Sequence, residues 1–97
     1  MKQYTIFALD HTDEDAINRR LAVRPTHLYG ASALKKAGNL VTGGALLDEA
    51  GKMIGSNMIV QFETEEEFQA YLKVEPYITG KVWDKITIYP FRMATVE

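Results

Sequence analysis

The sequence of 97 residues contains no cysteine, which excludes a disulfide framework and any cysteine-ligated zinc or iron–sulfur site. No stretch approaches the roughly 20 apolar residues that a membrane-spanning helix needs. Residues 1–6 also lack the long apolar run and the cleavage site of a signal peptide. These absences predict a cytoplasmic protein that has no membrane partner.

An excess of basic charge is absent as well, because the formal net charge at pH 7 is −2. Nucleic acids and anionic membranes attract basic surfaces, so this charge disfavours both partners. RNA-binding domains of βαββαβ order carry a basic and aromatic signature on their third strand. Residues 53–60 read Met-Ile-Gly-Ser-Asn-Met-Ile-Val and lack that signature, so we expect no nucleic-acid partner.

A chain this short supports one hydrophobic core, so residues 1–97 are expected to form a single domain. Hydrophobic residues make up 46% of the sequence and charged residues 25%, as in ordinary globular proteins. Runs of β-forming residues predict strands at residues 2–9, 39–46, 53–62 and 83–91. A turn at residues 48–52 joins the second and third strands into a hairpin.

The first helix is expected between the turn at residues 10–13 and Gly38, with Thr12 or Asp13 as its N-cap. Pro25 lies inside this stretch, and a proline removes a backbone donor and disfavours helical geometry in the residue before it. We therefore expect a short helix before Pro25 and a longer one after it. The spacing also predicts one apolar stripe, formed by Ile17, Leu21, Leu28, Ala31 and Leu34.

The second helix is expected to begin at a capping box, in which Thr64 is the N-cap and Glu67 reaches back to it. It is expected to end at Glu75, because Pro76 follows. Its buried face is predicted to consist of Phe68, Tyr71 and Leu72.

The resulting order predicts an α+β fold of ferredoxin-like βαββαβ type, an antiparallel four-stranded sheet with two helices on one face. The first strand is apolar on both sides, whereas a sheet covered on one face only should alternate apolar and polar residues. By alternation the uncovered face carries a mixed set of side chains: Phe7, Leu9, Ile59, Gln61, Thr87 and Tyr89. A second copy of the chain is the simplest cover for this face, so we expect a homodimer formed through the sheet.

Arg20, Arg24 and His27 are spaced by four and three residues, which places them along one edge of the first helix. Arginine offers planar bidentate donors and histidine exchanges a proton near neutral pH, so together they suit an anionic or phenolic small molecule. Glu75 approaches His27 if the two helices lie side by side. A carboxylate there would hold the imidazole in one tautomer and make it a better general base.

Each of these residues also has a simpler interpretation. Two arginines on a helix often form a solvated face, and a lone helical histidine is often a surface or satisfied core residue. Glu75 before Pro76 is explained equally well as the end of a helix. His11 lies in a turn and offers at most a weak metal ligand, and Gly43-Gly44 lacks the strand-to-helix setting of a phosphate loop. We expect no metal and no cofactor.

Several short motifs together resemble the YCII-related domain family in their order and separations. They are Arg24-Pro25-Thr26-His27-Leu28, Gly44-Ala45-Leu46, Glu75-Pro76-Tyr77 with Gly80, and Tyr89-Pro90-Phe91. The resemblance implies a dimeric α/β barrel, in which two ferredoxin-like units pack sheet against sheet. Family members carry a histidine in the first helix paired with an aspartate before Pro-Tyr, proposed as an active site. One branch eliminates chloride from a chlorinated hydroxyquinol.

On this resemblance, the family's histidine corresponds to His27 and its acidic residue to Glu75. Glutamate stands where the family usually has aspartate, and its extra methylene alters the geometry of the pair. Ala45 stands where the family's glycine is usually followed by proline, a change that loosens the loop and says little about chemistry.

Three hypotheses of function follow. The first is a small cofactor-free lyase or isomerase acting on a hydroxylated ring or a small acid. Its catalytic residues would be His27 as general base and Glu75 as orienting partner, with Arg20 and Arg24 binding the substrate. The second is a binding or sensing module that holds a metabolite in the same pocket without turnover. The third is an accessory domain whose role is assembly.

Overall fold

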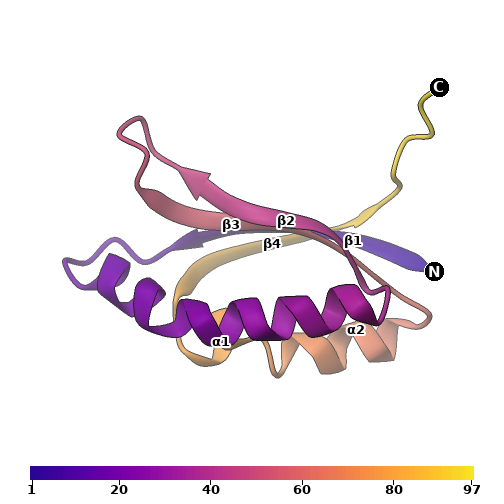
Figure 1. Cartoon of the computed structure of the whole chain (residues 1–97), viewed down its shortest axis with the longest axis horizontal. Coiled ribbons are helices and arrows are strands. Elements are labelled where there is room, and N and C mark those ends of the chain that lie inside the picture. The colour runs from indigo at the N-terminus through magenta and orange to yellow at the C-terminus, as the bar shows by residue number, and fades with distance from the viewer.

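The computed structural model describes residues 1–97, and its strands and helices follow in the order β1, α1, β2, β3, α2, α3, β4 (Figure 1). The strands span Lys2–Asp10 (β1), Leu40–Leu47 (β2), Met53–Phe62 (β3) and Trp83–Phe91 (β4). The helices span Ala16–Lys36 (α1), Glu65–Leu72 (α2) and Pro76–Thr79 (α3). Every strand end lies within one residue of its predicted position, whereas the helix ends differ more.

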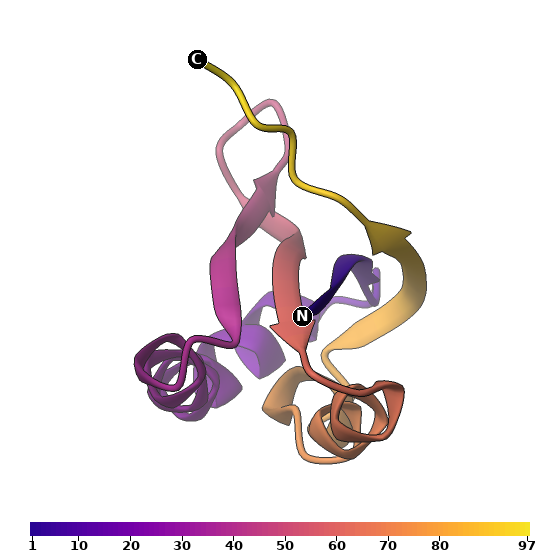
Figure 2. The same ribbon diagram turned by 90° about the vertical axis from the view of Figure 1, so that its right-hand side faces the viewer.

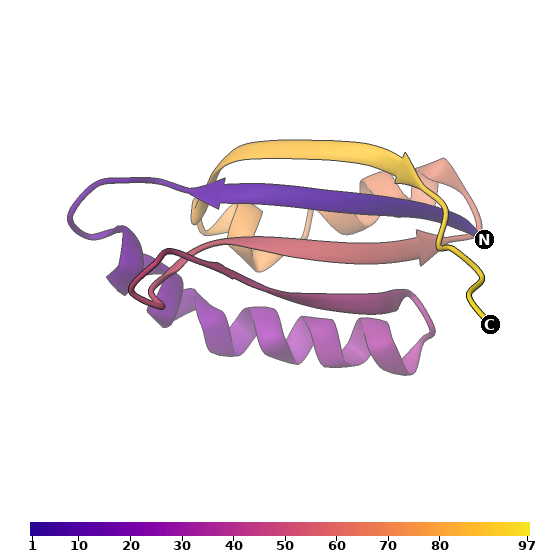
Figure 3. The ribbon, with the colours of Figure 1, turned by 90° about the horizontal axis from the view of Figure 1, so that it is seen from above.

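The strands form one antiparallel sheet in the order β2-β3-β1-β4, and all the helices lie on one of its faces (Figures 1 and 2). α1 lies toward the β2 edge of the sheet and α2 toward the β4 edge (Figures 2 and 3). This arrangement confirms the predicted ferredoxin-like α+β fold, with the four-residue helix α3 as an addition. The opposite face of the sheet has no covering layer in this chain.

The hydrophobic core lies between the sheet and the helices. The inner face of β1 supplies Tyr4, Ile6 and Ala8, which alternate with outward-facing residues as strand geometry requires. Phe68 of α2 stacks on Tyr4 with ring centroids 3.9 Å apart. Full burial of an apolar side chain of this size stabilises the fold by roughly 1.5–3 kcal/mol. The core contains 11 buried residues: Tyr4, Ile6, Ala8, Met58, Val60, Phe62, Phe68, Tyr71, Tyr77, Val82 and Trp83.

α1 continues through Pro25 without a break, so the predicted division into two helices is wrong. Proline has no N–H to donate to the carbonyl of Leu21, which loses its usual helical partner. Leu21 is 50% exposed, so water reaches this part of the helix. On either side of the proline, Arg20 and His27 are buried against other elements. These two anchors hold both halves of the helix in line.

The face of α1 that packs against the protein is more polar than predicted. Its two buried residues are Arg20 and His27, whereas Leu21 and Leu28 of the predicted apolar stripe are 50% and 46% exposed. The predicted stripe is therefore wrong at Leu21 and Leu28, whereas Leu34 packs against the core. Partners on other elements satisfy the two buried polar side chains. No helix of the chain is both long enough and apolar enough to cross a membrane.

The first turn of α1 lacks the predicted side-chain cap. Asp15 occupies the N-cap position and its side chain makes no capping hydrogen bond, so the prediction of Thr12 or Asp13 as the cap is wrong. The Asp13 carboxylate instead accepts hydrogen bonds from the Arg19 guanidinium at 2.8 and 3.2 Å. An arginine therefore competes for the carboxylate that would otherwise cap the helix.

α2 begins as predicted but ends earlier. The Thr64 side chain accepts a hydrogen bond from the backbone N–H of Glu67 at 3.2 Å, which confirms Thr64 as the N-cap. The predicted helix end at Glu75 is wrong, because Pro76 begins the separate helix α3 and Glu75 is its N-cap. Proline suits the first position of a helix, where its missing N–H has no partner to lose. The Glu75 carboxylate accepts from the Tyr77 N–H at 3.2 Å, a cap that turns this side chain into the protein.

The sheet face opposite the helices exposes large apolar side chains. Strand pairing aligns Phe7 with Asn57 and Thr87 across this face, which confirms the alternation read from the sequence. Phe7, Leu9 and Tyr89 are 50%, 41% and 62% exposed. Several exposed apolar side chains on one face of a sheet often mark an interaction face.

Pro25→Ala is expected to raise the free energy of unfolding by about 1–3 kcal/mol, because the new N–H can donate to the Leu21 carbonyl. Urea denaturation measures the gain. Thr26→Ala, at the adjacent exposed position of the same helix, is the control and should change stability by about 0.5 kcal/mol or less. A loss of stability in Pro25→Ala would contradict a continuous helix at this position.

Candidate active site

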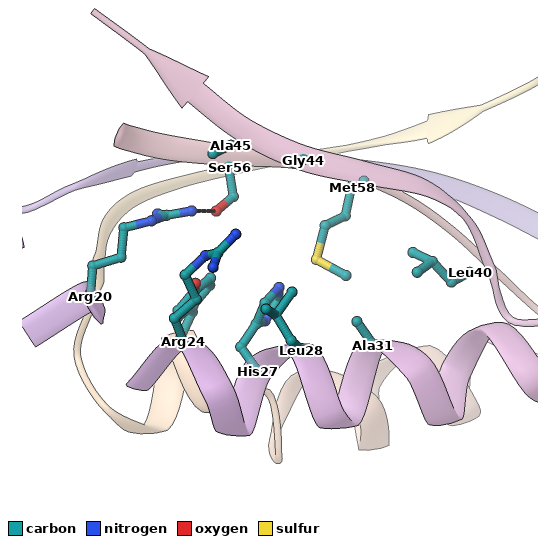
Figure 4. A pocket seen from close by; sticks show the side chains of 12 residues that line it. Arg20, Arg24, His27, Leu28, Ala31, Leu40, Gly44, Ala45, Ser56 and Met58 are labelled. Atoms are coloured by element: carbon teal, nitrogen blue, oxygen red, sulfur yellow. Dashed lines mark hydrogen bonds between the residues drawn. The ribbon is translucent and has the colours of Figure 1, made fainter. Parts of the chain in front are cut away.

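A cavity of about 210 Å³ lies between α1 and the strands β2 and β3 (Figure 4). The predicted site residues His27, Arg20 and Arg24 line it from α1, and Tyr77 reaches it from α3. Glu75 lies outside the lining and contacts His27. The lining comprises 12 residues: Arg20, Arg24, His27, Leu28, Ala31, Leu40, Gly43, Gly44, Ala45, Ser56, Met58 and Tyr77.

His27 and Glu75 are 48 positions apart in the sequence, and the fold brings them into contact. The Nδ1 atom of His27 lies 2.5 Å from Oε1 of Glu75. The two side chains are 10% and 3% exposed. The contact depends on two features of the fold. α1 continues past Pro25, which turns His27 toward the interior, and Glu75 caps α3, which turns its carboxylate toward α1.

The Glu75 carboxylate accepts three hydrogen bonds. Besides His27, the Tyr71 hydroxyl donates to Oε2 at 2.5 Å and the Tyr77 N–H donates to Oε1 at 3.2 Å. Burial acts to raise the pKa of Glu75, but the hydrogen bonds from His27, Tyr71 and the Tyr77 N–H outweigh it, and the pKa is lowered. Burial raises the pKa of the Tyr71 phenol, so Tyr71 stays protonated and donates. Glu75 is therefore a carboxylate at neutral pH.

The charge of Glu75 determines the tautomer of His27. An ionised carboxylate can only accept hydrogen bonds, so Nδ1 of His27 is protonated and donates a hydrogen bond to Oε1. In the neutral imidazole, Nε2 then holds the free lone pair. Nε2 makes no hydrogen bond within the protein, and His27 lines the cavity (Figure 4). The site can thus present an unprotonated nitrogen base to a molecule in the cavity.

The Tyr77 ring supports the two buried polar residues of α1. It stacks on the His27 imidazole with ring centroids 3.9 Å apart and an interplanar angle of 12°. The Arg20 guanidinium carbon lies 4.7 Å from the centroid of the same ring. Tyr77 therefore restricts the plane of the imidazole, while Glu75 sets its hydrogen-bonding direction.

Arg20 and Arg24 differ in their surroundings. Arg20 is 2% exposed, and its Nη1 donates to both carboxylate oxygens of Asp10 at 3.0 and 3.1 Å. Burial raises the pKa of Asp10, and the hydrogen bonds and charge of Arg20 oppose the rise. Arg24 is exposed and forms no ion pair, so its charge is free to meet a ligand. Substrate binding by either arginine stays a prediction. Arg24 is the better candidate, because the charge of Arg20 is already compensated by Asp10.

Sequence reasoning missed several residues of the site. Tyr71 was assigned to the core, although its spacing of four residues from Glu75 on a predicted helix would have allowed a hydrogen bond. Tyr77 lies in the Glu75-Pro76-Tyr77 motif, but nothing in the sequence indicates that its ring supports His27. Asp10 and Ser56 carried no local signal, because their partner Arg20 lies on another element.

The remaining candidates from the sequence lie elsewhere or play other parts. His11 Nδ1 is 3.8 Å from Asp84 Oδ1 at a half-exposed position outside the cavity. No group of three or more His, Cys, Asp or Glu side chains is arranged to hold a metal ion. Gly43 and Gly44 lie on a strand, as predicted, and line the cavity.

A model of the YCII-related domain matches residues 4–92 of this chain. Protein YciI of Escherichia coli is 34% identical over 95 residues, which cover 92% of this chain and 95% of that protein.

Two solved structures share the fold. The 5-chloro-2-hydroxyhydroquinone dehydrochlorinase of Burkholderia phenoliruptrix, in complex with 2,5-dihydroxybenzoquinone, has a TM-score of 0.80 at 18% identity and covers 95% of both chains. A dimeric ferredoxin-like protein of unknown function from Jannaschia sp. has a TM-score of 0.57 at 11% identity and covers 96% of this chain and 100% of its own. At these identities the likeness concerns the fold alone.

Glu75→Gln keeps the shape of the side chain and removes its charge. In the wild type, the lowered pKa of Glu75 contributes stability that is present above the ordinary value of 4.5 and is lost as pH falls through the folded-state value. The variant is expected to be less stable by about 1–3 kcal/mol at neutral pH, and to lose less stability than the wild type between about pH 5 and pH 3. Urea denaturation at several pH values measures both effects.

Glu49→Gln serves as the control for this series, because Glu49 is exposed and its side chain has no hydrogen-bond partner. Its stability should follow that of the wild type at every pH. A Glu75→Gln profile parallel to the wild type would contradict a charged, hydrogen-bonded Glu75.

Proposed function

The chain belongs to the YCII-related domain family, and we propose that it is a small enzyme, a lyase or isomerase that moves a proton on a hydroxylated ring or a small acid. The observation that carries the proposal is the buried Glu75 carboxylate, which leaves Nε2 of His27 as a free base at the cavity. The dehydrochlorinase of the same fold, solved with a hydroxyquinone, supports this class of substrate.

His27 acts as the general base in this proposal. Nε2 takes a proton from a hydroxyl or an acidic C–H of the substrate, and the electron pair left behind moves into the ring. In an elimination, this pair forms a double bond to a saturated carbon of the substrate, and the bond from that carbon to its leaving anion breaks. In an isomerisation, another carbon of the ring takes the proton back from His27. In both reactions the Glu75 carboxylate stabilises the imidazolium that forms.

Arg24 binds the negative charge of the substrate. Its guanidinium lies at the cavity and has no carboxylate partner, whereas the charge of Arg20 is compensated by Asp10. A free guanidinium beside a cavity with apolar walls favours a flat anionic or phenolic molecule. A cavity of about 210 Å³ has room for a single substituted ring.

The active form is proposed to be a homodimer joined through the uncovered sheet face. The exposed side chains of Phe7, Leu9 and Tyr89 support this, because a second copy would remove their apolar surface from water. The ferredoxin-like protein from Jannaschia sp. is dimeric, which supports a dimer for this fold.

His27→Ala is expected to lower kcat by about 10²–10⁴-fold, the usual contribution of a positioned general base. The assay follows product formation from hydroxyquinols, their chlorinated forms, hydroxyquinones and small carboxylic acids by absorbance and mass spectrometry. His11→Ala removes the other histidine of the chain, which lies outside the cavity, and should keep the wild-type kcat. Full activity in His27→Ala would refute the assignment. Ligand binding without turnover across the panel would favour a sensing module instead.

Phe7→Asp is expected to convert the dimer to a monomer, because it would place an unpaired carboxylate in an apolar interface. Sedimentation velocity measures the change. Tyr29→Asp introduces the same charge at a position of α1 that is 82% exposed, and it should leave the dimer intact. A wild-type chain that sediments as a monomer at all concentrations would rule out the interface.

A further inference from the structure

We propose that Ser56 is a specificity-determining hydrogen-bond donor of the cavity. It would select ligands that place an acceptor oxygen, such as a phenolate, carboxylate or carbonyl oxygen, between Ser56 and Arg24. The proposal rests on the function proposed above, because it sets the orientation of a ligand relative to His27. Ser56 is 2% exposed on the inner face of β3 and lines the cavity (Figure 4).

Both lone pairs of the Ser56 hydroxyl are occupied by donors. Arg20 Nη2 donates to Oγ at 2.9 Å, and Trp83 Nε1 donates to it at 3.1 Å. A hydroxyl offers two acceptor lone pairs and one proton. Guanidinium and indole N–H groups can only donate, so neither contact can receive the hydroxyl proton. The proton of Ser56 must therefore point away from Arg20 and Trp83.

The two donors have little freedom to turn away from Ser56. Nη1 of Arg20 is held by both carboxylate oxygens of Asp10, and the guanidinium lies over the Tyr77 ring. The Trp83 side chain is buried in the core at 5% exposure. This network orients the serine hydroxyl before any ligand arrives, which lowers the entropy cost of binding.

No acceptor of the protein receives the Ser56 proton, because its hydroxyl makes hydrogen bonds only to Arg20 and Trp83. A buried donor without an acceptor is unfavourable, so this proton needs a partner. The cavity is the open space beside Ser56. An oxygen atom of a bound molecule would supply the missing acceptor.

Arg24 converges on the same end of the cavity. Figure 4 shows its guanidinium reaching from α1 toward Ser56, with His27 next along the helix. An oxygen between Ser56 and Arg24 would accept from one neutral and one charged donor. An ammonium or amide N–H at this point would meet two donors and no acceptor. Ser56 and Arg24 therefore favour ligands with an acceptor oxygen over ligands with a donor group at this point. A ligand bound this way extends toward His27.

The strand beside Ser56 carries small residues where it lines the cavity. Ala45 pairs with Ser56 and Gly43 with Met58 across β2 and β3. A Cβ atom at Gly43 would lie 3.3 Å from Cγ of Met58, closer than ordinary contact. Gly43, Gly44 and Ala45 thus add little side-chain volume to this wall of the cavity.

Isothermal titration with 2,5-dihydroxybenzoquinone as the probe compares the wild type with Ser56→Ala and Trp83→Phe. Both variants break the Ser56–Trp83 hydrogen bond, but Trp83→Phe keeps the serine hydroxyl, and Trp83 does not line the cavity. Ser56→Ala is expected to weaken binding about tenfold or more, and Trp83→Phe about threefold or less. Ser56→Cys, a weak donor of similar shape, should show the larger loss if Ser56→Ala does not fold.

Equal affinity losses in Ser56→Ala and Trp83→Phe would overturn the proposal, as would unchanged affinity in Ser56→Ala. Failure of the wild type to bind the probe at millimolar concentration would overturn it too. Turnover assays distinguish this inference from the proposed enzymatic function. Activity that depends on His27 but is unchanged in Ser56→Ala would support the enzymatic function and refute the Ser56 subsite. Ligand binding that depends on Ser56, without turnover, would support the subsite and refute the enzymatic function.

Discussion

The buried carboxylate of Glu75 is the interaction on which the site and the packing of the helices depend. It caps α3, accepts a hydrogen bond from the Tyr71 hydroxyl at the end of α2, and accepts another from Nδ1–H of His27 on α1. One side chain thus joins three helices. A buried charge is tolerated only when its hydrogen bonds are made. The same hydrogen bonds to Glu75 therefore hold the helices together and determine the tautomer of His27.

A second polar cluster holds the other end of α1. Arg20 reaches Asp10 of β1 and Ser56 of β3, and Trp83 of β4 completes the cluster. α1 is therefore anchored to the sheet by charged and polar groups, and it is anchored to the other helices by His27. Apolar packing between α1 and the β2 edge is incomplete, which leaves the cavity between the two anchors. The interior tolerates these polar groups because each one has a hydrogen-bonding partner on another element.

The two faces of the sheet differ because the helices cover only one of them (Figure 1). The inner face of β1 and β3 is divided between an apolar core under α2 and the polar cluster under α1. The outer face has no helix to cover it, and Phe7 and Tyr89 stay exposed. The proposed dimer and the proposed site therefore use opposite faces, and the sheet gives both a rigid support.

The sequence by itself determined the order of elements, the strand ends and the cap at Thr64, because alternation and capping depend on neighbours along the chain. The pairing of His27 with Glu75 was inferred from family resemblance, and the residues alone left it open. Only the tertiary structure decided that α1 continues through Pro25, because buried anchors on both sides outweigh a local penalty. It also decided which arginine is compensated, since Asp10 and Arg20 meet only when β1 and α1 pack together.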